Sequence, residues 1–501
     1  MSEPSPASIR RLNRPQLRTL DANSPERHAS WLELFFDLVF VLAVSKVAII
    51  LAANTDGHGF LRYTALFVPL WWSWAGFTFY ADRFESEELS YRVLMFAGML
   101  AVAALSVSLA GAFTPAGDAA FVVCYSLVTL ILAALYVRAA FYVPLARAFA
   151  VQYVFGLSMT ALILGASLLF APPVRYFIWL AALVGELLIP FINRRLTRII
   201  PFDHSHIPER LGLFTIIVLG EAVIATANGA GVVSWNLTTI AGATLGFAIA
   251  ACIWWMNFEF VEDGAIHSRA LIPRFIYLYC HFFVVSSIVA LGIGIEHAIE
   301  QMGEAHLHAS TLWLLAGGTS VCLAAITVIR LASGVCRLLS VRIAAIAVSI
   351  ALAFAGPLLP PLAVIALFFG VFVAGVWLES RYSENKPRSE IAGLEACEHA
   401  EMATVFRPRS INGCEECIKN NYKWVHLRLC LTCGHVGCCD TSVNKHATKH
   451  YLKSDHPLMA SLEEGENWSW CYADERFVPL AHRIGKAAAE NLELKKKGKG
   501  S

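Results

Sequence analysis

The apolar residues of this sequence are gathered into long uninterrupted runs, without the short alternating patterns of a water-soluble protein. Between residues 31 and 380 these runs approach or exceed the ~20 residues that a helix needs to cross a bilayer core. We separate about twelve of them and predict that each forms a membrane-spanning helix. The predicted spans are 31–53, 60–80, 91–113, 119–141, 146–170, 172–192, 210–228, 238–261, 269–299, 308–332, 339–356 and 362–380.

Composition agrees with a membrane protein. Of the 501 residues 57% are hydrophobic and 15% are charged, whereas a soluble domain carries roughly a quarter charged residues. Residues 1–30 are polar, with no apolar core and no small-residue cleavage site, so we predict a tail and not a cleaved signal peptide. The net charge of +1 gives no indication of a nucleic-acid partner, and none is expected.

The arginines predict the orientation of the spans. An even number of spans puts both termini on one side, and positively charged loops mark the cytoplasmic side. Loops and helix ends on the other side carry Arg62 and Arg175. Those on the N-terminal side carry Arg83, Arg92, Arg138, Arg147, Arg194, Arg195, Arg198, Arg210, Arg269, Arg274, Arg330, Arg337 and Arg342. We therefore predict that both termini are cytoplasmic.

The two halves of the apolar region resemble each other. Trp71-Trp72 is matched by Trp254-Trp255, and Arg92 by Arg274, at a nearly constant offset. Six spans per half would make the halves parallel repeats. Secondary transporters are often built in this way, with a binding site between the repeats. We predict a 6+6 parallel repeat.

Charged residues inside the spans are costly and often functional. Glu33 and Asp37 lie four apart and share a helix face. Arg210 and Glu221 also return to nearly the same face, too far apart along the helix to pair directly. These four residues predict a polar pathway or binding site. The alternative is that they link neighbouring helices, with Glu33 and Arg210 reaching out to water at the helix ends.

Three segments of the apolar region match a known family. They are SWLELFFDLVF at 30–40, ADRF at 81–84, and HIPERLGLF at 206–214, which continues to LGE at 219–221. Over about residues 28–380 the chain resembles the bacterial low temperature requirement protein A family. The resemblance implies a multi-pass bacterial inner-membrane protein linked to growth at low temperature. It supplies no established biochemical activity.

The end of the chain has a different composition. A polar linker, residues 381–395, precedes a segment rich in Cys and His at 396–480, and a basic tail follows at 481–501. Cysteines of a reducing cytoplasm are available as thiolates, and a Cys-x-x-Cys pair places two of them on one Zn²⁺. The candidate ligands are Cys397, His399, Cys414, Cys417, Cys430, Cys433, Cys438, His446, His450, His456, Cys471 and Asp474.

These ligands suffice for three tetrahedral Zn²⁺ sites. A domain of this size has little apolar core, and bound metal would supply the missing folding free energy. Sites closed by four protein ligands are structural and not catalytic. The chain has no phosphate-binding glycine loop and no nucleophile motif, so we do not expect an enzyme.

The Cys/His pattern resembles the zinc finger of the ubiquitin-specific protease type (UBP-type). The match runs through WVHLRLCLTCGHVGCCD at 424–440, HATKH at 446–450, HP at 456–457 and WCY at 470–472. The resemblance implies three ligand sets: Cys397, His399, Cys471 and Asp474; Cys414, Cys417, Cys438 and His446; Cys430, Cys433, His450 and His456. The eukaryotic three-zinc form has a cysteine where Asp474 stands.

The same resemblance raises the question of a ligand. In eukaryotic relatives the finger grips the Gly-Gly tail of ubiquitin with an arginine and an aromatic pocket. Trp470 and Tyr472 are similar to those aromatic residues, which implies a peptide pocket; the alternative is that they pack the core. Asp440 stands at the arginine position and would repel a terminal carboxylate. Ubiquitin is therefore not expected, and the partner is an unknown protein or peptide.

The sequence thus predicts an all-α polytopic membrane domain, residues 31–380, followed by a small α+β zinc finger domain. Two functions remain open. One is a transporter-like or low-temperature stress protein that uses the finger to bind a protein or peptide. The other is a membrane sensor that signals through the finger to a partner.

Overall fold

The computed structural model describes residues 15–17, 29–85, 88–192, 206–260, 271–335, 338–384 and 397–478, apart from 398, 400, 401, 406, 411, 441, 464–467 and 475. The chain divides into two compact units, Met1–Glu379 and Ser380–Ser501. We call them the membrane unit and the finger unit and describe each by itself. The predicted tails, 1–30 and 481–501, and the predicted linker, 381–395, lie almost wholly outside the described residues.

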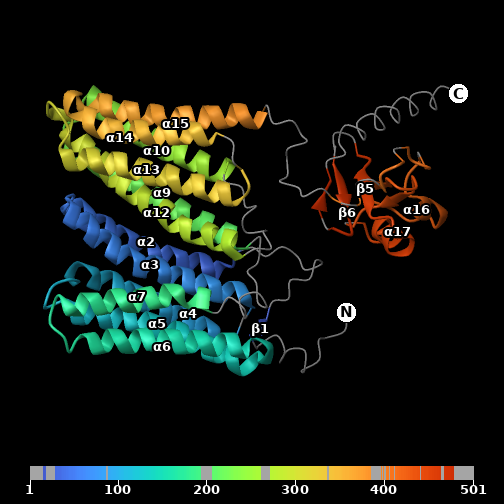
Figure 1. Ribbon diagram of the computed structural model, residues 1–501, viewed down its shortest axis with the longest axis horizontal. Coiled ribbons are helices and arrows are strands. Elements are labelled where there is room, and N and C mark those ends of the chain that lie inside the picture. The colour runs from blue at the N-terminus through green and yellow to red at the C-terminus, as the bar shows by residue number, and fades with distance from the viewer. Residues whose placement is uncertain are drawn as a thin grey trace. The chain divides into compact units, whose positions relative to one another are not determined.

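The described part of the membrane unit is helical, as predicted (Figure 1). A short β1 (Gln16–Leu17) pairs with β2 (Phe84–Glu85). The long helices are α2 (Trp31–Ala53), α3 (Gly57–Arg83), α4 (Leu89–Ser108), α5 (Asp118–Tyr142), α6 (Arg147–Ser167), α7 (Val174–Ile192), α9 (His206–Val232), α10 (Leu237–Glu259), α12 (Leu271–Glu300), α13 (Ala309–Ala332), α14 (Leu339–Ala355) and α15 (Pro361–Glu384).

Among the described residues, 11 helices are long and apolar enough to cross a membrane. Helix α3 occupies the predicted span 60–80 but is not one of them. Its sequence is rich in aromatic residues that carry a polar group, including Trp71, Trp72 and Trp74, and these residues lower its mean hydropathy. The all-α membrane unit is confirmed, and the count of twelve spans stays a prediction.

The helices pack in a similar order in the two halves. Helix α2 packs on α3 and α4, and α4 on α5, while α9 packs on α10 and α12, and α12 on α13. The matched tryptophans differ in burial: Trp71 and Trp72 are buried, whereas Trp254 and Trp255 are half exposed. The 6+6 repeat therefore also stays a prediction.

Helices α2, α9 and α12 lie together, and local chemistry places them. Ser30 caps α2 by accepting a hydrogen bond from the Glu33 backbone, while the Glu33 side chain accepts one from the Ser30 backbone. Gly292 lets α12 approach α9 closely, because a Cβ atom there would lie 2.9 Å from the Cα of Ala222. Small residues at such contacts are typical of helix packing in membranes.

The finger unit is a five-stranded antiparallel sheet with two short helices, the predicted small α+β fold. The strand order is β4-β3-β5-β6-β7. The strands are β3 (Leu427–Cys430), β4 (Val436–Cys438), β5 (Leu458–Ser461), β6 (Ser469–Cys471) and β7 (Arg476–Phe477), and the helices are α16 (Glu415–Lys419) and α17 (His446–Ser454). The small apolar core includes Leu429, Val436, Leu458 and Ala460.

Candidate functional site

The finger unit brings its Cys and His side chains together in three groups. Within each group the four candidate ligand atoms lie within 4.8 Å of one another. The first group is Cys414, Cys417, Cys438 and His446; the second is Cys430, Cys433, His450 and His456; the third is Cys397, His399, Cys471 and Asp474. These are the sets that the sequence resemblance implies.

The first group has the geometry of a tetrahedral zinc site. His446 Nδ1 lies 3.2 Å from Cys414 Sγ, 3.2 Å from Cys417 Sγ and 3.4 Å from Cys438 Sγ. The sulfurs of Cys417 and Cys438 are 3.9 Å apart. Tetrahedral bonds of the usual Zn–S and Zn–N lengths predict about 3.6 Å for N···S and about 3.8 Å for S···S. The four atoms therefore fit around one Zn²⁺.

Local structure sets these positions. Cys414 and Cys417 flank the first turn of α16, Cys438 ends β4, and His446 begins α17. Gly437 lets α17 lie against β4, because a Cβ atom there would be 2.6 Å from the backbone nitrogen of Ala447.

The second group is built on β3 and α17. Cys433 Sγ lies 3.3 Å from His450 Nε2, and the His450 and His456 rings have centroids 5.4 Å apart. His456 Nδ1 is buried without a hydrogen-bond partner among the described residues, as suits a metal ligand.

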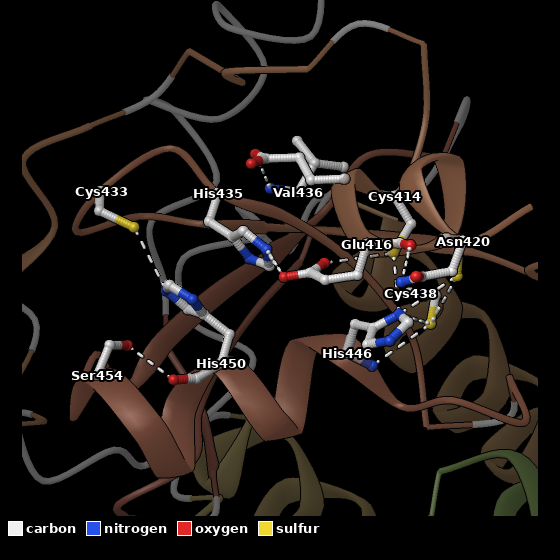
Figure 2. A network of polar contacts seen from close by, with 12 residues as sticks. Cys414, Glu416, Asn420, Cys433, His435, Val436, Cys438, His446, His450 and Ser454 are labelled. Atoms are coloured by element: carbon white, nitrogen blue, oxygen red, sulfur yellow. Dashed lines mark hydrogen bonds and ion pairs between the residues drawn. The ribbon is translucent and has the colours of Figure 1, made fainter. Parts of the chain in front are cut away.

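A glutamate and a histidine connect the first two groups (Figure 2). His435 Nε2 lies 2.7 Å from Glu416 Oε1, and the carboxylate of Glu416 also faces Cys414. The His435 ring stacks on His450, with centroids 4.1 Å apart and an 11° angle between the planes. His435 and Glu416 therefore hold ligand side chains in place without being ligands themselves.

The third group contains the carboxylate. His399 Nδ1 lies 3.2 Å from Asp474 Oδ2 and 3.7 Å from Cys471 Sγ. The Asp474 backbone N–H donates to Cys471 Sγ across 3.4 Å. The position of Asp474 thus lets its carboxylate take the role of the cysteine in the eukaryotic pattern, because carboxylate oxygens also bind Zn²⁺.

Burial shapes the protonation of these groups. It raises the pKa of Cys414 to about 12 and that of Cys430 to about 11. It lowers the pKa of His450 to about 4, and the nearby His435 and His456 act in the same direction. Zn²⁺ binds thiolate and neutral imidazole, so binding must displace the thiol protons, while His450 is already neutral.

The aromatic residues proposed for a peptide pocket, Trp470 and Tyr472, are both partly buried. Tyr472 stacks on Tyr451, with centroids 5.3 Å apart. Its hydroxyl donates to Asp440 Oδ2 at 3.4 Å and lies 3.3 Å from the Thr448 hydroxyl. Burial, together with the Asp440 carboxylate, raises the pKa of Tyr472 to about 12. Trp470, in β6, is partly buried.

The membrane unit contains a buried charge network. Arg210 Nη2 lies 2.6 Å from Asp37 Oδ1, and Arg210 Nη1 lies 3.5 Å from Glu33 Oε1. The indole N–H of Trp74 donates to the same Asp37 oxygen at 2.7 Å. Glu33, Asp37 and Arg210 are each 1% exposed. Glu33 and Arg210 therefore do not reach out to water, whereas the links between neighbouring helices that the same alternative predicted are present.

Two further members of this network were not predicted. His206 Nε2 lies 3.2 Å from Glu33 Oε1, and its Nδ1 lies 3.0 Å from Asp82 Oδ1. Asp82 and His206 lie in the family-like segments ADRF and HIPERLGLF, and their place in these segments could have indicated a functional role. Glu221, the fourth predicted residue, lies further along α9 and is buried outside this network.

Within the described residues, eleven apolar helices followed by a sheet with three Cys/His groups define a multi-pass membrane protein with a zinc-binding finger. The chain belongs to the bacterial low temperature requirement A protein family, whose model matches residues 28–377. A second family model, described as a Zn-finger in ubiquitin-hydrolases and other protein, matches residues 414–482.

Individual relatives each match part of this chain. An uncharacterized protein of Rhizobium meliloti is 27% identical over 55% of this chain and 71% of its own length. Histone deacetylase 6 of Caenorhabditis elegans is 30% identical over 21% of this chain, and ubiquitin carboxyl-terminal hydrolase 16 of mouse is 42% identical over 12%. Those matches cover 11% and 7% of the two proteins. A solution structure of a Rhodopseudomonas palustris protein is 46% identical, covers 18% of this chain and 87% of its own, and has a TM-score of 0.17.

Proposed function

We propose that this protein is a transporter of the bacterial inner membrane that carries a structural, three-zinc UBP-type finger on its cytoplasmic side. Both termini would be cytoplasmic, as the arginine distribution predicts. The observation that carries the proposal is the buried network of Arg210, Glu33, Asp37, His206 and Asp82. Ionisable groups buried within a membrane bundle usually line the path of a solute or an ion.

The arrangement of the helices supports the same proposal. The network joins α2, α3 and α9, the first two helices of one half of the unit and the first helix of the other. Transporters built from repeated halves place their sites where the halves meet.

The test uses the purified full-length chain in proteoliposomes. The vesicles are incubated with a small-molecule extract of bacteria, and mass spectrometry identifies the solutes retained inside them. We expect at least one solute to accumulate with the unchanged protein and not with Asp37→Asn. Glu186→Gln is the matched control, because Glu186 is a buried glutamate on α7 that accepts from Tyr125 at 3.1 Å, outside the network. Equal retention by the unchanged protein and Asp37→Asn would contradict the proposal.

For the finger we propose a protein- or peptide-binding role without catalysis, in which ubiquitin and nucleic acid are not the partners. Asp440 is exposed and accepts from Tyr472, so a carboxylate stands where a chain-terminal carboxylate would have to bind. Asp440→Arg should therefore create binding to a peptide that ends in a free Gly-Gly carboxylate. Fluorescence anisotropy with that peptide and its C-terminal amide measures this gain. Binding of the free-carboxylate peptide by the unchanged protein would contradict the proposal.

A further inference from the structure

Polar and titratable side chains follow the shared face of α2, α9 and α12 from one helix end to the other. The three helices run in the same direction. Arg210 meets Asp37 near the starts of α9 and α2. Near the other end, the His297 ring of α12 lies 3.0 Å from the carbonyl oxygen of Ala52, the second-last residue of α2. The contacts between the three helices can therefore be followed level by level.

The first level is the charge network around His206. A neutral imidazole has one N–H and one lone pair. The two ring nitrogens of His206 lie 3.2 Å from Glu33 Oε1 and 3.0 Å from Asp82 Oδ1. This level therefore places one imidazole between two buried carboxylates, beside the Asp37–Arg210 ion pair.

The second level is Glu221 of α9. Ser45 of α2 lies close to its carboxylate. One oxygen of the Glu221 carboxylate, Oε2, is buried and has no hydrogen-bond partner in the part of the chain that the structure describes. The same holds for Asp37 Oδ2 at the first level. Buried polar atoms without a partner are rare and need an explanation. Both oxygens belong to the polar side chains along the shared face of α2, α9 and α12.

The third level is Glu296 of α12. Gly229 brings the backbones of α9 and α12 together there, because a Cβ atom on Gly229 would lie 2.6 Å from the Glu296 carbonyl oxygen. Glu296 interacts electrostatically with Glu221, and also with His297 and Glu300 next to it. The line thus reaches the opposite helix ends.

An apolar barrier separates the first two levels. Phe40 and Phe214 are buried between them, with ring centroids 6.5 Å apart. Asp37 and Ser45 are about 12 Å apart along α2 at 1.5 Å per residue. Roughly four hydrogen bonds of about 2.8 Å would span this gap through water. Apolar constrictions of this kind gate channels and transporters by excluding water.

From these contacts we infer that the coupling ion of this transporter is the proton, which moves between the Glu296, Glu221 and Asp37 carboxylates when the Phe40–Phe214 barrier admits water. The inference rests on the proposed function. Each step transfers one proton from a carboxylic acid to a carboxylate, so protons and charge balance without a redox partner. A proton fits better than a metal cation, because the Arg210 guanidinium already fills the cation position beside Asp37.

Other charged groups face or flank this path. The described helices packed on α9 add His281, which contacts the Tyr277 carbonyl of its own helix, and Glu259 at the end of α10. Among the described residues, the titratable and charged groups named for this path are Glu33, Asp37, Asp82, His206, Arg210, Glu221, Glu259, His281, Glu296, His297 and Glu300, and the same helices also carry Lys46, Arg83, Glu209 and Arg274.

The experiment measures proton entry into proteoliposomes of the full-length chain with trapped pyranine. A potassium gradient with valinomycin drives the flux, with and without the bacterial small-molecule extract outside. We expect proton entry above that of empty vesicles, at least a tenfold reduction in Glu221→Gln, and no change in Glu186→Gln. Phe214→Ala should increase proton entry, because it removes half of the barrier. Zinc content and a single peak in size-exclusion chromatography verify that each variant is folded.

The outcomes separate the two proposals. Solute retention without proton entry would overturn the inference that the proton is the coupling ion, and it would still support solute transport. Proton entry that Glu221→Gln does not reduce, or that Phe214→Ala does not increase, would overturn the path described here. Proton entry without retention of any solute supports the path and contradicts solute transport. Absence of both fluxes contradicts both proposals.

Discussion

Glu416 offers a sharp test of how the finger holds its metal. Its carboxylate contacts His435 at 2.7 Å, and the His435 ring stacks on His450 of the second group. The change Glu416→Ala removes this contact and frees the His435 ring. Because second-sphere contacts orient metal ligands, we expect the second group to bind Zn²⁺ more weakly while the third group is unaffected.

The magnitude follows from the geometry. A hydrogen bond to a charged group contributes about 1.5–3 kcal/mol. The Glu416 side chain is 38% exposed, whereas that of His435 is 7% exposed. Solvent weakens the interaction, so we take the lower end, about 1.5 kcal/mol. That value corresponds to about a tenfold loss of affinity at 1.4 kcal/mol per factor of ten.

The assay is competition between the full-length protein in detergent and a chromophoric zinc chelator. In Glu416→Ala, zinc bound by the second group should be released at about tenfold lower chelator concentration than in the unchanged protein. Glu463→Ala is the matched control. Glu463 is 33% exposed and accepts a hydrogen bond of the same length, 2.7 Å, from the Leu427 backbone. Identical release curves for Glu416→Ala and the unchanged protein, or an equal shift in the control, would refute the role of His435 as a support for His450.

Three further predictions follow from single contacts. Metal analysis of the full-length protein should find three zinc ions per chain, and Asp474→Ala should reduce this to two; a count of three in the variant would exclude Asp474 as a ligand. Gly437→Ala should destabilise the finger by about 1–3 kcal/mol, because the added methyl meets the backbone of Ala447, and chemical denaturation followed by zinc release measures it. Trp74→Phe should shift the pH profile of proton entry to higher pH, because it removes the 2.7 Å hydrogen bond that favours the charged form of Asp37, and an unchanged pH profile would contradict that contact.

The finger could be predicted in detail because its chemistry is local. Cys414 and Cys417 must face one ion when they flank a single turn, and His446 and His450 must share a face of one helix. The resemblance then supplied the pairing, and the structure brings the same residues together. The sequence also leaves His435 as a supporting residue and not a ligand, but its contacts with Glu416 and His450 could not be predicted, because they depend on how β4 and α16 pack against α17.

The helical membrane unit could also be predicted, because span length and apolar content are read directly from the sequence. The count of spans is less secure at α3. Its aromatic residues, such as Trp74, are buried against neighbouring helices and do not need the hydropathy of a lipid-facing surface. Hydropathy measures how well a segment suits lipid, so it underestimates a span that is surrounded by protein.

The charge network marks the limit of reasoning from one helix at a time. Periodicity predicts that Glu33 and Asp37 share a face, but it cannot say which face of α9 meets them, and Arg210 is separated from Asp37 by 173 positions. The family segments contain that missing information. The segment at 30–40 supplies Glu33 and Asp37, that at 81–84 supplies Asp82, and that at 206–214 supplies His206 and Arg210. Three segments that are distant in the chain therefore meet at one buried cluster, so the sequence features that define the family and the proposed ion site are the same side chains.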